Sequence, residues 1–528
     1  MITKFLRTIF VCLILQAVCF GNSAQASFAE KEPRTKFPVF ARVSDIAQRP
    51  VDFGPTVNLP EENEIKREKA EKETSAPRLI PQHYITEDKS IRESSEITEK
   101  NLFQTNSLFL FKGIIDIGNF ENQLPADPIM AAGPNQVIAA VNKTIAIFNK
   151  DGTRVFQTGL ATWFSSLPDA VGKGLFDPRL TYDQYNGHFI FICAAAGGSD
   201  HRSLVLFSVS KTSDATGEWA FWTLDMQLNN HTHVNVFADF PGVGYDTEAI
   251  YVTANMFNLS PFHYASAKIR VLKKSEVYSF QGITWHDFWN FRDATGAKAI
   301  NVEPAQNFGT IDREYLLSSN AVHGDKLTLY TITDPTGSPA FQKTPVQVSS
   351  YRIAPNAEQR GGTVRLNSGD AGLTNVVCVN GTTLYAANAV KYDWGKGANA
   401  AARFYIISTT GTVIEETTFG GPGYYYYYPV VMVDSQNNIV MAFNRSSANT
   451  FAGIFFTTRK ATDPAGFFGP DMRIKSGIAY YNIPTQGGFD LWGDFNGIAL
   501  DSDDSIWMFS MYAKTSHQWG TRGARFHF

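Results

Sequence analysis

Pro178-Arg179-Leu180-Thr181-Tyr182-Asp183 is the clearest copy of a unit that recurs along most of the chain. In this unit a short apolar strand ends in a turn residue five positions after the proline, and a second apolar strand follows at 188–194. The unit returns at 241–246, 429–434 and 496–501, and weaker copies begin at Pro128, Asn375 and, weakest, Pro304. The seven turn residues stand at 133, 183, 246, 309, 380, 434 and 501, so the spacing between them runs from 50 to 71 residues.

A unit of this length has room for about four short strands, which is the repeat of a β-propeller blade. Several units contain a further uninterrupted apolar run, as at 203–209, 326–332 and 453–457, which is typical of strands covered on both faces. We therefore predict an all-β fold, a single seven-bladed β-propeller of four-stranded antiparallel blades over residues 101–528. An early strand within Leu108–Ile117 should close it by pairing with the C-terminal strands.

The overall charge excludes one class of function. The chain has 528 residues, with 46 Lys and Arg against 50 Asp and Glu, and a formal net charge of −4. A nucleic-acid-binding protein should show a concentrated basic face, and no such excess is present. We expect no nucleic-acid partner.

The N-terminus has the pattern of an export signal. Lys4 and Arg7 precede an apolar run at 9–20, and the small residues Ala24 and Ala26 then predict cleavage between Ala26 and Ser27. The apolar run is too short for a permanent transmembrane helix, and no later segment is long enough, so we expect none. Residues 1–26 are thus a predicted signal peptide, and the protein should be periplasmic, secreted or on the cell surface.

Residues 27–100 differ from the rest of the chain. They are rich in charge and interrupted by prolines, which predicts a largely disordered spacer. The alternative is a propeptide or an arm that docks a partner. Beyond the signal peptide only Cys193 and Cys378 remain, each inside an apolar run, and whether they pair is left open by their spacing.

One turn carries a family resemblance. Ser213-Asp214-x-x-Gly217-Glu218-Trp219 looks like the Asp-box turn of sialidase-type propeller blades. The order of Asp177-Pro178-Arg179, Ala238-Asp239-Phe240-Pro241 and Trp492-Gly493-Asp494-Phe495 is similar to that of a group of exported bacterial propeller proteins, mostly uncharacterised. The resemblance covers about 120–528 and implies the architecture, because Asp boxes are structural turns distant from any catalytic centre.

Four aspartates precede predicted innermost strands: Asp127, Asp177, Asp239 and Asp494. The repeat should place them around one mouth of a central channel. Carboxylates gathered in this way repel one another unless they cap backbone N–H groups or bind a hard cation such as Ca²⁺. We expect capping, and we keep these four residues as the candidate metal ligands.

The leading functional hypothesis is a non-catalytic recognition or adhesion module that binds a glycan, a surface or a protein ligand, acting as a monomer. Its candidate ligand-binding residues are Tyr425, Tyr427, Trp492, His231 and His233. The alternative is a sialidase-like glycoside hydrolase acting at the channel mouth, which needs paired carboxyl groups and cations for an acidic substrate. Its candidate residues are Asp177, Arg179, Asp239, Arg360 and Asp494. A simpler role for Arg179 is an ion pair between two blades.

Overall fold

The computed structural model describes residues 35–46, 82–84, 107–115, 125–309, 311–483 and 488–528. The chain divides into two compact units, Met1–Pro33 and Arg34–Phe528, and the described residues all belong to the second. The predicted signal peptide and its cleavage point at Ala26 and Ser27 lie outside the described residues. None of the helices in the described part is long and apolar enough to cross a membrane.

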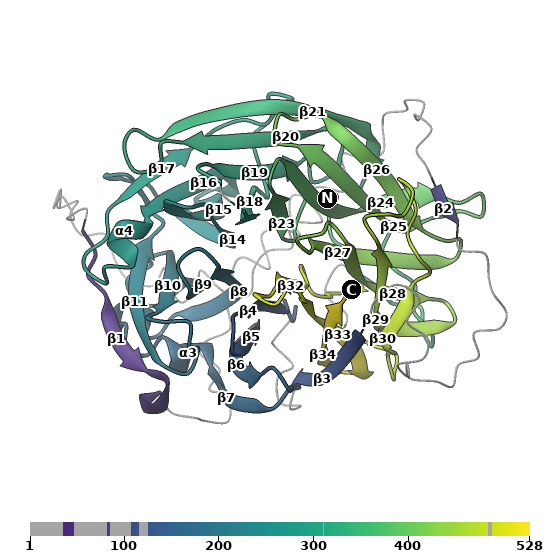
Figure 1. The fold of residues 1–528 in the computed structure, drawn as a ribbon, viewed down its shortest axis with the longest axis horizontal. Coiled ribbons are helices and arrows are strands. Elements are labelled where there is room, and N and C mark those ends of the chain that lie inside the picture. The colour runs from purple at the N-terminus through teal and green to yellow at the C-terminus, as the bar shows by residue number, and fades with distance from the viewer. Residues whose placement is uncertain (1–34, 47–81, 85–106, 116–124, 310, 484–487) are drawn as a thin grey trace. The chain divides into compact units, whose positions relative to one another are not determined.

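The described residues are almost entirely β-strands, joined in antiparallel groups of four (Figure 1). The first three groups are β4 to β7 (Ile129–Ala132, Gln136–Val141, Thr144–Asn149, Arg154–Gly159), β8 to β11 (Gly174–Asp183, His188–Ala196, Leu204–Ser210, Glu218–Asp225) and β14 to β17 (Val236–Tyr245, Ala249–Leu259, Phe262–Lys273, Trp285–Trp289). The next two are β18 to β21 (Glu303–Phe308, Glu314–Ser319, His323–Thr333, Ala340–Arg352) and β23 to β26 (Val377–Asn380, Thr383–Asp393, Ala398–Ser408, Val413–Gly420). The last two are β27 to β30 (Tyr424–Val433, Ile439–Ser447, Thr450–Arg459, Met472–Lys475) and β32 to β34 (Gly497–Leu500, Ile506–Thr515, Gln518–His527) with β3 (Ser107–Ile115).

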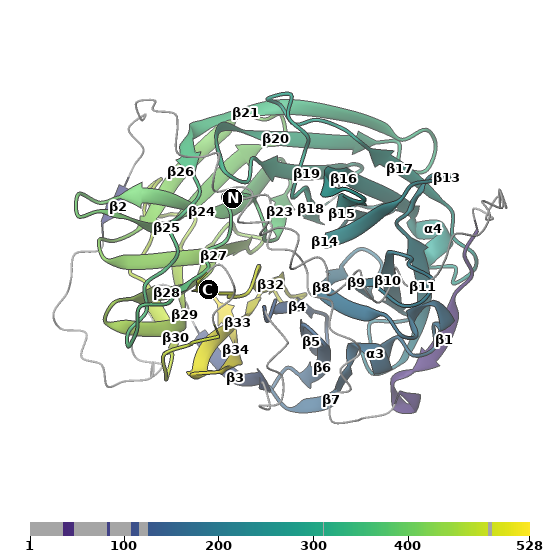
Figure 2. The same ribbon diagram turned by 180° about the vertical axis from the view of Figure 1, so that it is seen from behind.

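The groups are arranged as in a β-propeller. Within Arg34–Phe528 the first strand of each group lies nearest the centre and the last strand lies outermost (Figures 1 and 2). Neighbouring first strands meet in parallel, β14 with β18 at Tyr245 and Gln306, and β18 with β23 along four residue pairs. Each predicted repeat falls on one of these inner strands. The apolar residues of the repeat are buried, as expected for strands that adjacent sheets cover on both faces.

The last group joins the two ends of the described chain. β3 pairs antiparallel with β34, from Ser107 opposite His527 to Ile115 opposite Gly520. This is the pairing expected of the segment Leu108–Ile117. The two paired strands come from opposite ends of the described sequence. The group therefore cannot be completed until both ends of the chain are present.

Two pieces of the predicted spacer pair with outer strands. β1 (Val39–Arg42) adds a fifth strand beside β11, and the short η2 turn (Val43–Asp45) follows it. β2 (Gln82–Tyr84) pairs in parallel with β26. These pieces are ordered against the sheets, whereas the other residues of 27–100, apart from those adjoining β1, lie outside the described residues.

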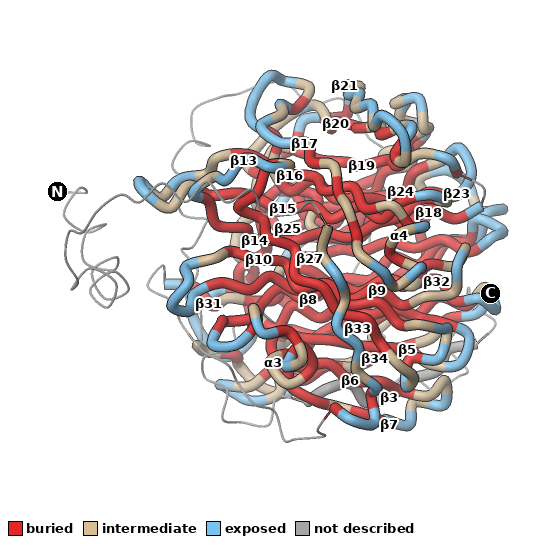
Figure 3. The backbone as a smooth tube through the Cα atoms, turned by 90° about the vertical axis from the view of Figure 1, so that its left-hand side faces the viewer, coloured by how far each residue is buried: buried red, intermediate tan, exposed pale blue. Residues whose placement is uncertain are grey.

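The interior is made of the strands themselves, while exposed residues gather in the connecting loops (Figure 3). Cys193 and Cys378 are both buried and unpaired, so the two thiols form no disulfide. The turn between β10 and β11 is held by Asp214, whose Oδ1 accepts hydrogen bonds from the Thr216 amide (2.9 Å) and hydroxyl (2.7 Å). Asp at this position therefore fixes the turn, as the sequence indicates.

The first and last groups approach each other closely at Gly497, and a substitution there tests this packing. A Cβ there would lie 2.6 Å from the amide nitrogen of Met130 and 2.8 Å from the carbonyl carbon of Ile129. Gly497→Ala should therefore lower the free energy of unfolding by about 1–3 kcal/mol. Urea denaturation measures this, with Gly217→Ala as control, since its Cβ would meet its nearest atom at 3.3 Å in a surface turn. An unchanged midpoint for Gly497→Ala would contradict this packing.

Candidate functional site at the channel mouth

The inner strands of several groups are distorted at the same point. Asp127, Asp177, Phe240 and Tyr428 each precede a proline and have φ of 49° or 50°, a left-handed conformation rare outside glycine. Register shifts mark the same place in three strands, after Phe176, Asp239 and Tyr427. These bulges turn the side chains out of the regular alternation at matching positions of the inner strands. We call the residues around these bulges the mouth.

Asp127 joins the first group to the last. Its Oδ1 accepts a hydrogen bond from the Asp494 amide at 2.9 Å, and its Oδ2 accepts one from the Asn142 side-chain amide at 2.6 Å. The carboxyl group therefore caps a backbone N–H of the neighbouring group.

Asp177 repeats this arrangement between the next groups. Its amide donates to Asn142 Oδ1 at 2.8 Å, and its Oδ2 accepts from the Phe240 amide at 3.1 Å. Asp127, Asn142 and Asp177 thus form a continuous chain of hydrogen bonds between neighbouring groups, and the capping role expected for the aspartates is the one these two residues have.

The same carboxyl groups perturb one another. Burial raises the pKa of Asp127 well above its usual value, and the nearby charges of Asp494 and Asp177 raise it further. Burial also raises the pKa of Asp177, although Arg179 and a hydrogen bond from Asp127 oppose this. The pKa of Asp127 is raised because ionising it would place neighbouring negative charges together in a buried site.

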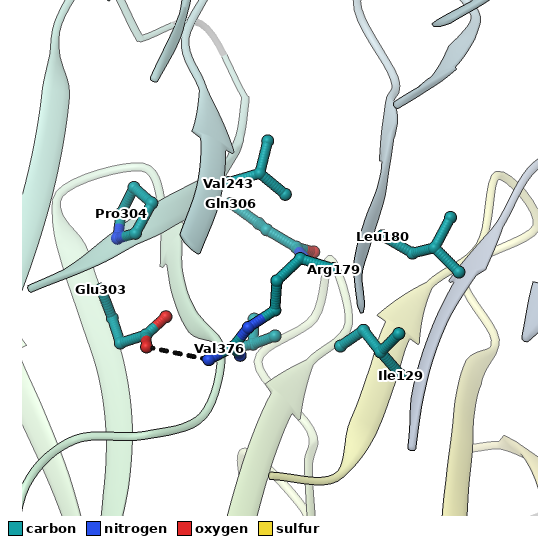
Figure 4. Close-up of a pocket in the computed structure, with 8 residues that line it drawn as sticks. All are labelled: Ile129, Arg179, Leu180, Val243, Glu303, Pro304, Gln306 and Val376. Carbon is teal, nitrogen blue, oxygen red and sulfur yellow. Dashed lines mark hydrogen bonds and ion pairs between the residues drawn. The ribbon is translucent and has the colours of Figure 1, made fainter. Parts of the chain in front are cut away.

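Arg179 lies between the inner strands, beside the hydrogen-bonded chain of Asp127, Asn142 and Asp177. Its guanidinium lies 3.7 Å from the ring centre of Phe495 and 4.7 Å from that of Phe240. It forms an ion pair of 3.3 Å with Glu303 and donates to the carbonyl of Thr374 at 3.4 Å. Arg179 of β8 thus contacts residues of β14 and β18 and of the segments before β23 and β32. Figure 4 shows Arg179 reaching Glu303 across the small pocket that both line.

Arg179 and Glu303 are 3 % and 4 % exposed, so neither is available to a ligand from solvent. Burial raises the pKa of Glu303 to about 7, although the Arg179 charge lowers it. The ion pair is thus a buried contact between groups, which is the simpler role that the sequence allows for Arg179. The half-buried residues Asp239, Asp494 and Phe240 remain at the surface of the mouth.

Tyr428 and Asp370 also belong to the mouth, and the sequence analysis missed both as site residues. Tyr428 is 2 % exposed, and the pKa of its phenol is raised well above the usual value by burial and by Asp494, Asp127 and Asp370. Asp370 accepts hydrogen bonds from the Gly372 amide (2.6 Å) and from the side chain of Asn301 (3.0 Å). The Tyr-Pro pair at 428–429 matches the Asp-Pro pairs at 127 and 177, which is the signal that could have identified Tyr428.

Three predicted ligand-binding aromatics lie inside the protein. Tyr425 and Tyr427 are buried, and the Tyr427 hydroxyl donates to Ser446 Oγ. Trp492 is fully buried, with its ring edge-on to Tyr481 at 5.2 Å. Two loops run together near them through the parallel pair of β22 (Arg365–Leu366) and β31 (Phe489–Asp490). These rings therefore contribute to the core and offer no surface to a ligand.

The remaining candidates are exposed. Arg360 is exposed, and its guanidinium lies 5.4 Å from the centre of the Phe451 ring. Phe451 is not one of the residues that contact Arg179, so the two arginines do not share a site. His231 and His233 lie on the hairpin of β12 (Leu228–Asn229) and β13 (Thr232–His233), which Asn230 ties to Asp287 of β17. The contacts of these residues do not bring them to the aspartates of the mouth.

The candidate metal ligands have other partners. In the described part of the chain no group of three or more His, Cys, Asp or Glu is placed to hold a metal ion. Asp127 and Asp177 direct their oxygens to backbone and side-chain N–H groups instead.

The chain matches no family model, and no curated protein matches it. Solved structures give distant likenesses. A protein of unknown function from Dyadobacter fermentans is 11 % identical, with a TM-score of 0.35 over 67 % of this chain and 95 % of its own. The phage phi92 endosialidase is 9 % identical, with a TM-score of 0.39 over 80 % and 69 %. The Penicillium chrysogenum α-L-arabinanase is 10 % identical, with a TM-score of 0.36 over 66 % and 92 %. At these scores no activity is transferred to this chain.

The Arg179–Glu303 pair can be tested by removing its charges in turn. Arg179→Met leaves a buried carboxylate without its partner and should cost about 3–5 kcal/mol of unfolding free energy. Arg179→Met with Glu303→Gln should recover a large part of that loss, because no buried charge then remains. Urea denaturation of the two variants measures the difference, and equal losses would show that the ion pair does not hold the centre.

Glu303 also predicts a pH dependence. Its pKa is raised from 4.5 to about 7 in the folded protein, so the stability it contributes is complete below pH 4.5 and is lost as the pH rises through 7. Relative to wild type, Glu303→Gln should therefore gain up to about 3 kcal/mol between pH 4.5 and pH 8. Unfolding free energies measured across this range check it, and parallel curves would contradict it.

Proposed function

We propose that this protein is an exported recognition module that binds a glycan or a surface ligand at the mouth of a closed seven-bladed β-propeller. The antiparallel groups of four strands are its blades, each beginning with a copy of the repeat. The pairing of β3 with β34 supports closure. The Asp214 turn supports an Asp-box-like element between the third and fourth strands of its blade.

The observation that carries this proposal is how the candidate catalytic groups are used. Asp127 and Asp177 cap backbone amides, and Arg179 is paired with Glu303 and enclosed by two phenylalanines. A hydrolase needs a free acid and a nucleophile or base on either side of the bond that it cleaves. Asp239, Asp494 and Phe240 are half-buried, and we propose that they provide hydrogen bonding and ring contact to the ligand.

Export and tethering belong to the same proposal. Residues 1–26 carry the signal pattern, and residues 27–100 connect it to the propeller. The docking of β1 on β11 and of β2 on β26 supports a spacer that lies partly against the outer strands. We place the protein in the periplasm, in the medium or on the cell surface, acting as a monomer.

A glycoside hydrolase is the second candidate, and one observation favours it. Burial raises the pKa of both Asp127 and Asp177 at the mouth, and a carboxyl group with a raised pKa is what a general acid requires. This role needs the pair to be released from its capping bonds when substrate binds.

Glycan binding and turnover separate the two functions. The purified protein should bind members of an immobilised glycan panel without hydrolysing fluorogenic glycosides, sialosides included, with Ca²⁺ or with chelator. Asp239→Asn and Asp494→Asn should each weaken binding about tenfold, because each removes a charged hydrogen-bond acceptor at the mouth. Asp312→Asn, at an exposed surface pair, is the matched control.

Turnover that is abolished by Asp177→Asn would overturn the recognition proposal and establish the hydrolase. Folded protein that neither binds nor hydrolyses any member of the panel would overturn both.

A further inference from the structure

Lys143 has a completely buried amine with no hydrogen-bond partner among the described residues. The residue is 6 % exposed and lies in the turn between β5 and β6. Its φ of 73° belongs to the left-handed region, which Gly or Asn adopts at lower cost. A lysine is almost never buried without a paired charge, because its ammonium group loses its hydration. A buried, unpartnered lysine in a strained turn therefore points to a role for its side chain.

The backbone of this turn is held in place on both sides. The carbonyl of Lys143 accepts a hydrogen bond from the Leu160 amide at 2.9 Å. The side chain of the preceding residue, Asn142, donates to Asp127 at 2.6 Å and accepts from the Asp177 amide at 2.8 Å. The turn therefore fixes where the lysine side chain starts relative to Asp177, on β8 of the next blade.

The Lys143 amine lies near the bulge of β8. The register of β8 and β9 shifts at Asp177, which places Cys193 of β9 opposite the bulge. Asp177 and Cys193 are the ionisable groups that act on the amine. The amine makes no hydrogen bond with either of them, so rotation about the bonds of the lysine side chain has to close the remaining gap before a reaction.

Burial favours the neutral form of the amine and of the carboxyl group. It lowers the pKa of Lys143 to about 8, and it raises the pKa of Asp177, although the charge of Arg179 opposes this. A neutral amine is a nucleophile, and a neutral carboxyl group can lose its hydroxyl, whereas an ammonium and a carboxylate only attract each other. Two such groups held close together in one fold react as an intramolecular pair.

We propose that the Nζ atom of Lys143 and the side-chain carboxyl group of Asp177 form an isopeptide bond, which joins the first blade to the second. The bond from Nζ to Cγ of Asp177 forms, and the bond from Cγ to one oxygen breaks. That oxygen leaves as water, with the proton of the carboxyl group and one proton of the amine, so no oxidant is consumed. The other oxygen still accepts from the Phe240 amide. This inference is independent of the proposed recognition function.

Asp127 is the group that moves the proton. Its carboxyl group is in hydrogen-bond contact with that of Asp177, and burial raises its pKa well above the usual value, which favours the protonated form. Asp127 gives its proton to the departing hydroxyl and takes one from the amine, so it is unchanged after the reaction.

Mass spectrometry of the full protein tests the bond. Tryptic digestion of the denatured protein should give one pair of joined peptides that contain Lys143 and Asp177, with a combined mass about 18 Da below the sum of the two because one water is lost. Trypsin should fail to cleave after Lys143. Lys143→Met and Asp177→Ala should each abolish the joined pair, and Asp127→Ala should leave most of the protein unlinked.

Cys193→Ala is the matched control, because it removes the other neighbour of the amine and leaves both reacting groups in place. The joined pair should persist in it. Separate wild-type peptides with unmodified masses and cleavage after Lys143 would overturn the proposal. A joined pair that survives in Asp177→Ala but is lost in Cys193→Ala would assign the link to the thiol and overturn the isopeptide bond. Full linkage in Asp127→Ala would overturn the role of that carboxyl group.

Discussion

Arg179 brings a positive charge into the buried centre of the inner strands, where one carboxylate, Glu303, balances it. A pair of this kind is stable only when its geometry is enforced from several sides, because both charges have lost their hydration. Phe240 and Phe495 enclose the guanidinium and Thr374 accepts from it, so segments far apart in the sequence must be in place at once. The inner strands depend on this arrangement for their relative positions.

The mouth follows from the same constraint. At the bulges of the inner strands, the left-handed residues before proline interrupt the ladder, and the amides released there need acceptors. Carboxyl and amide side chains from neighbouring blades supply them, at Asp127, Asn142 and Asp177. Asp127 and Asp177 are therefore structural, and their burial near other carboxyl groups accounts for the raised pKa of Asp127.

Much of the fold could be read from local sequence. The repeat that begins at Pro178 falls on β8, and its six other copies fall on the first strands of the other groups. The closing strand was also identifiable, because Leu108–Ile117 is the apolar segment left over before the first repeat. The site was harder to predict. Tyr425 and Tyr427 stand out in a run of five tyrosines, yet both are buried, while Tyr428 at the end of the run faces the aspartates.

The sequence by itself determined the all-β class, the repeat and the turns, because periodicity, prolines and Asp side chains act over a few residues. It also placed four aspartates one or two positions before the first residue of a repeat. Only the tertiary structure decided what those residues do, since the partner of Asp127 is the amide of Asp494, 367 positions away, and the partner of Arg179 is Glu303, 124 positions away. Burial and the charge of distant neighbours decide whether a carboxyl group caps, pairs or binds, and neither can be known before the blades are assembled.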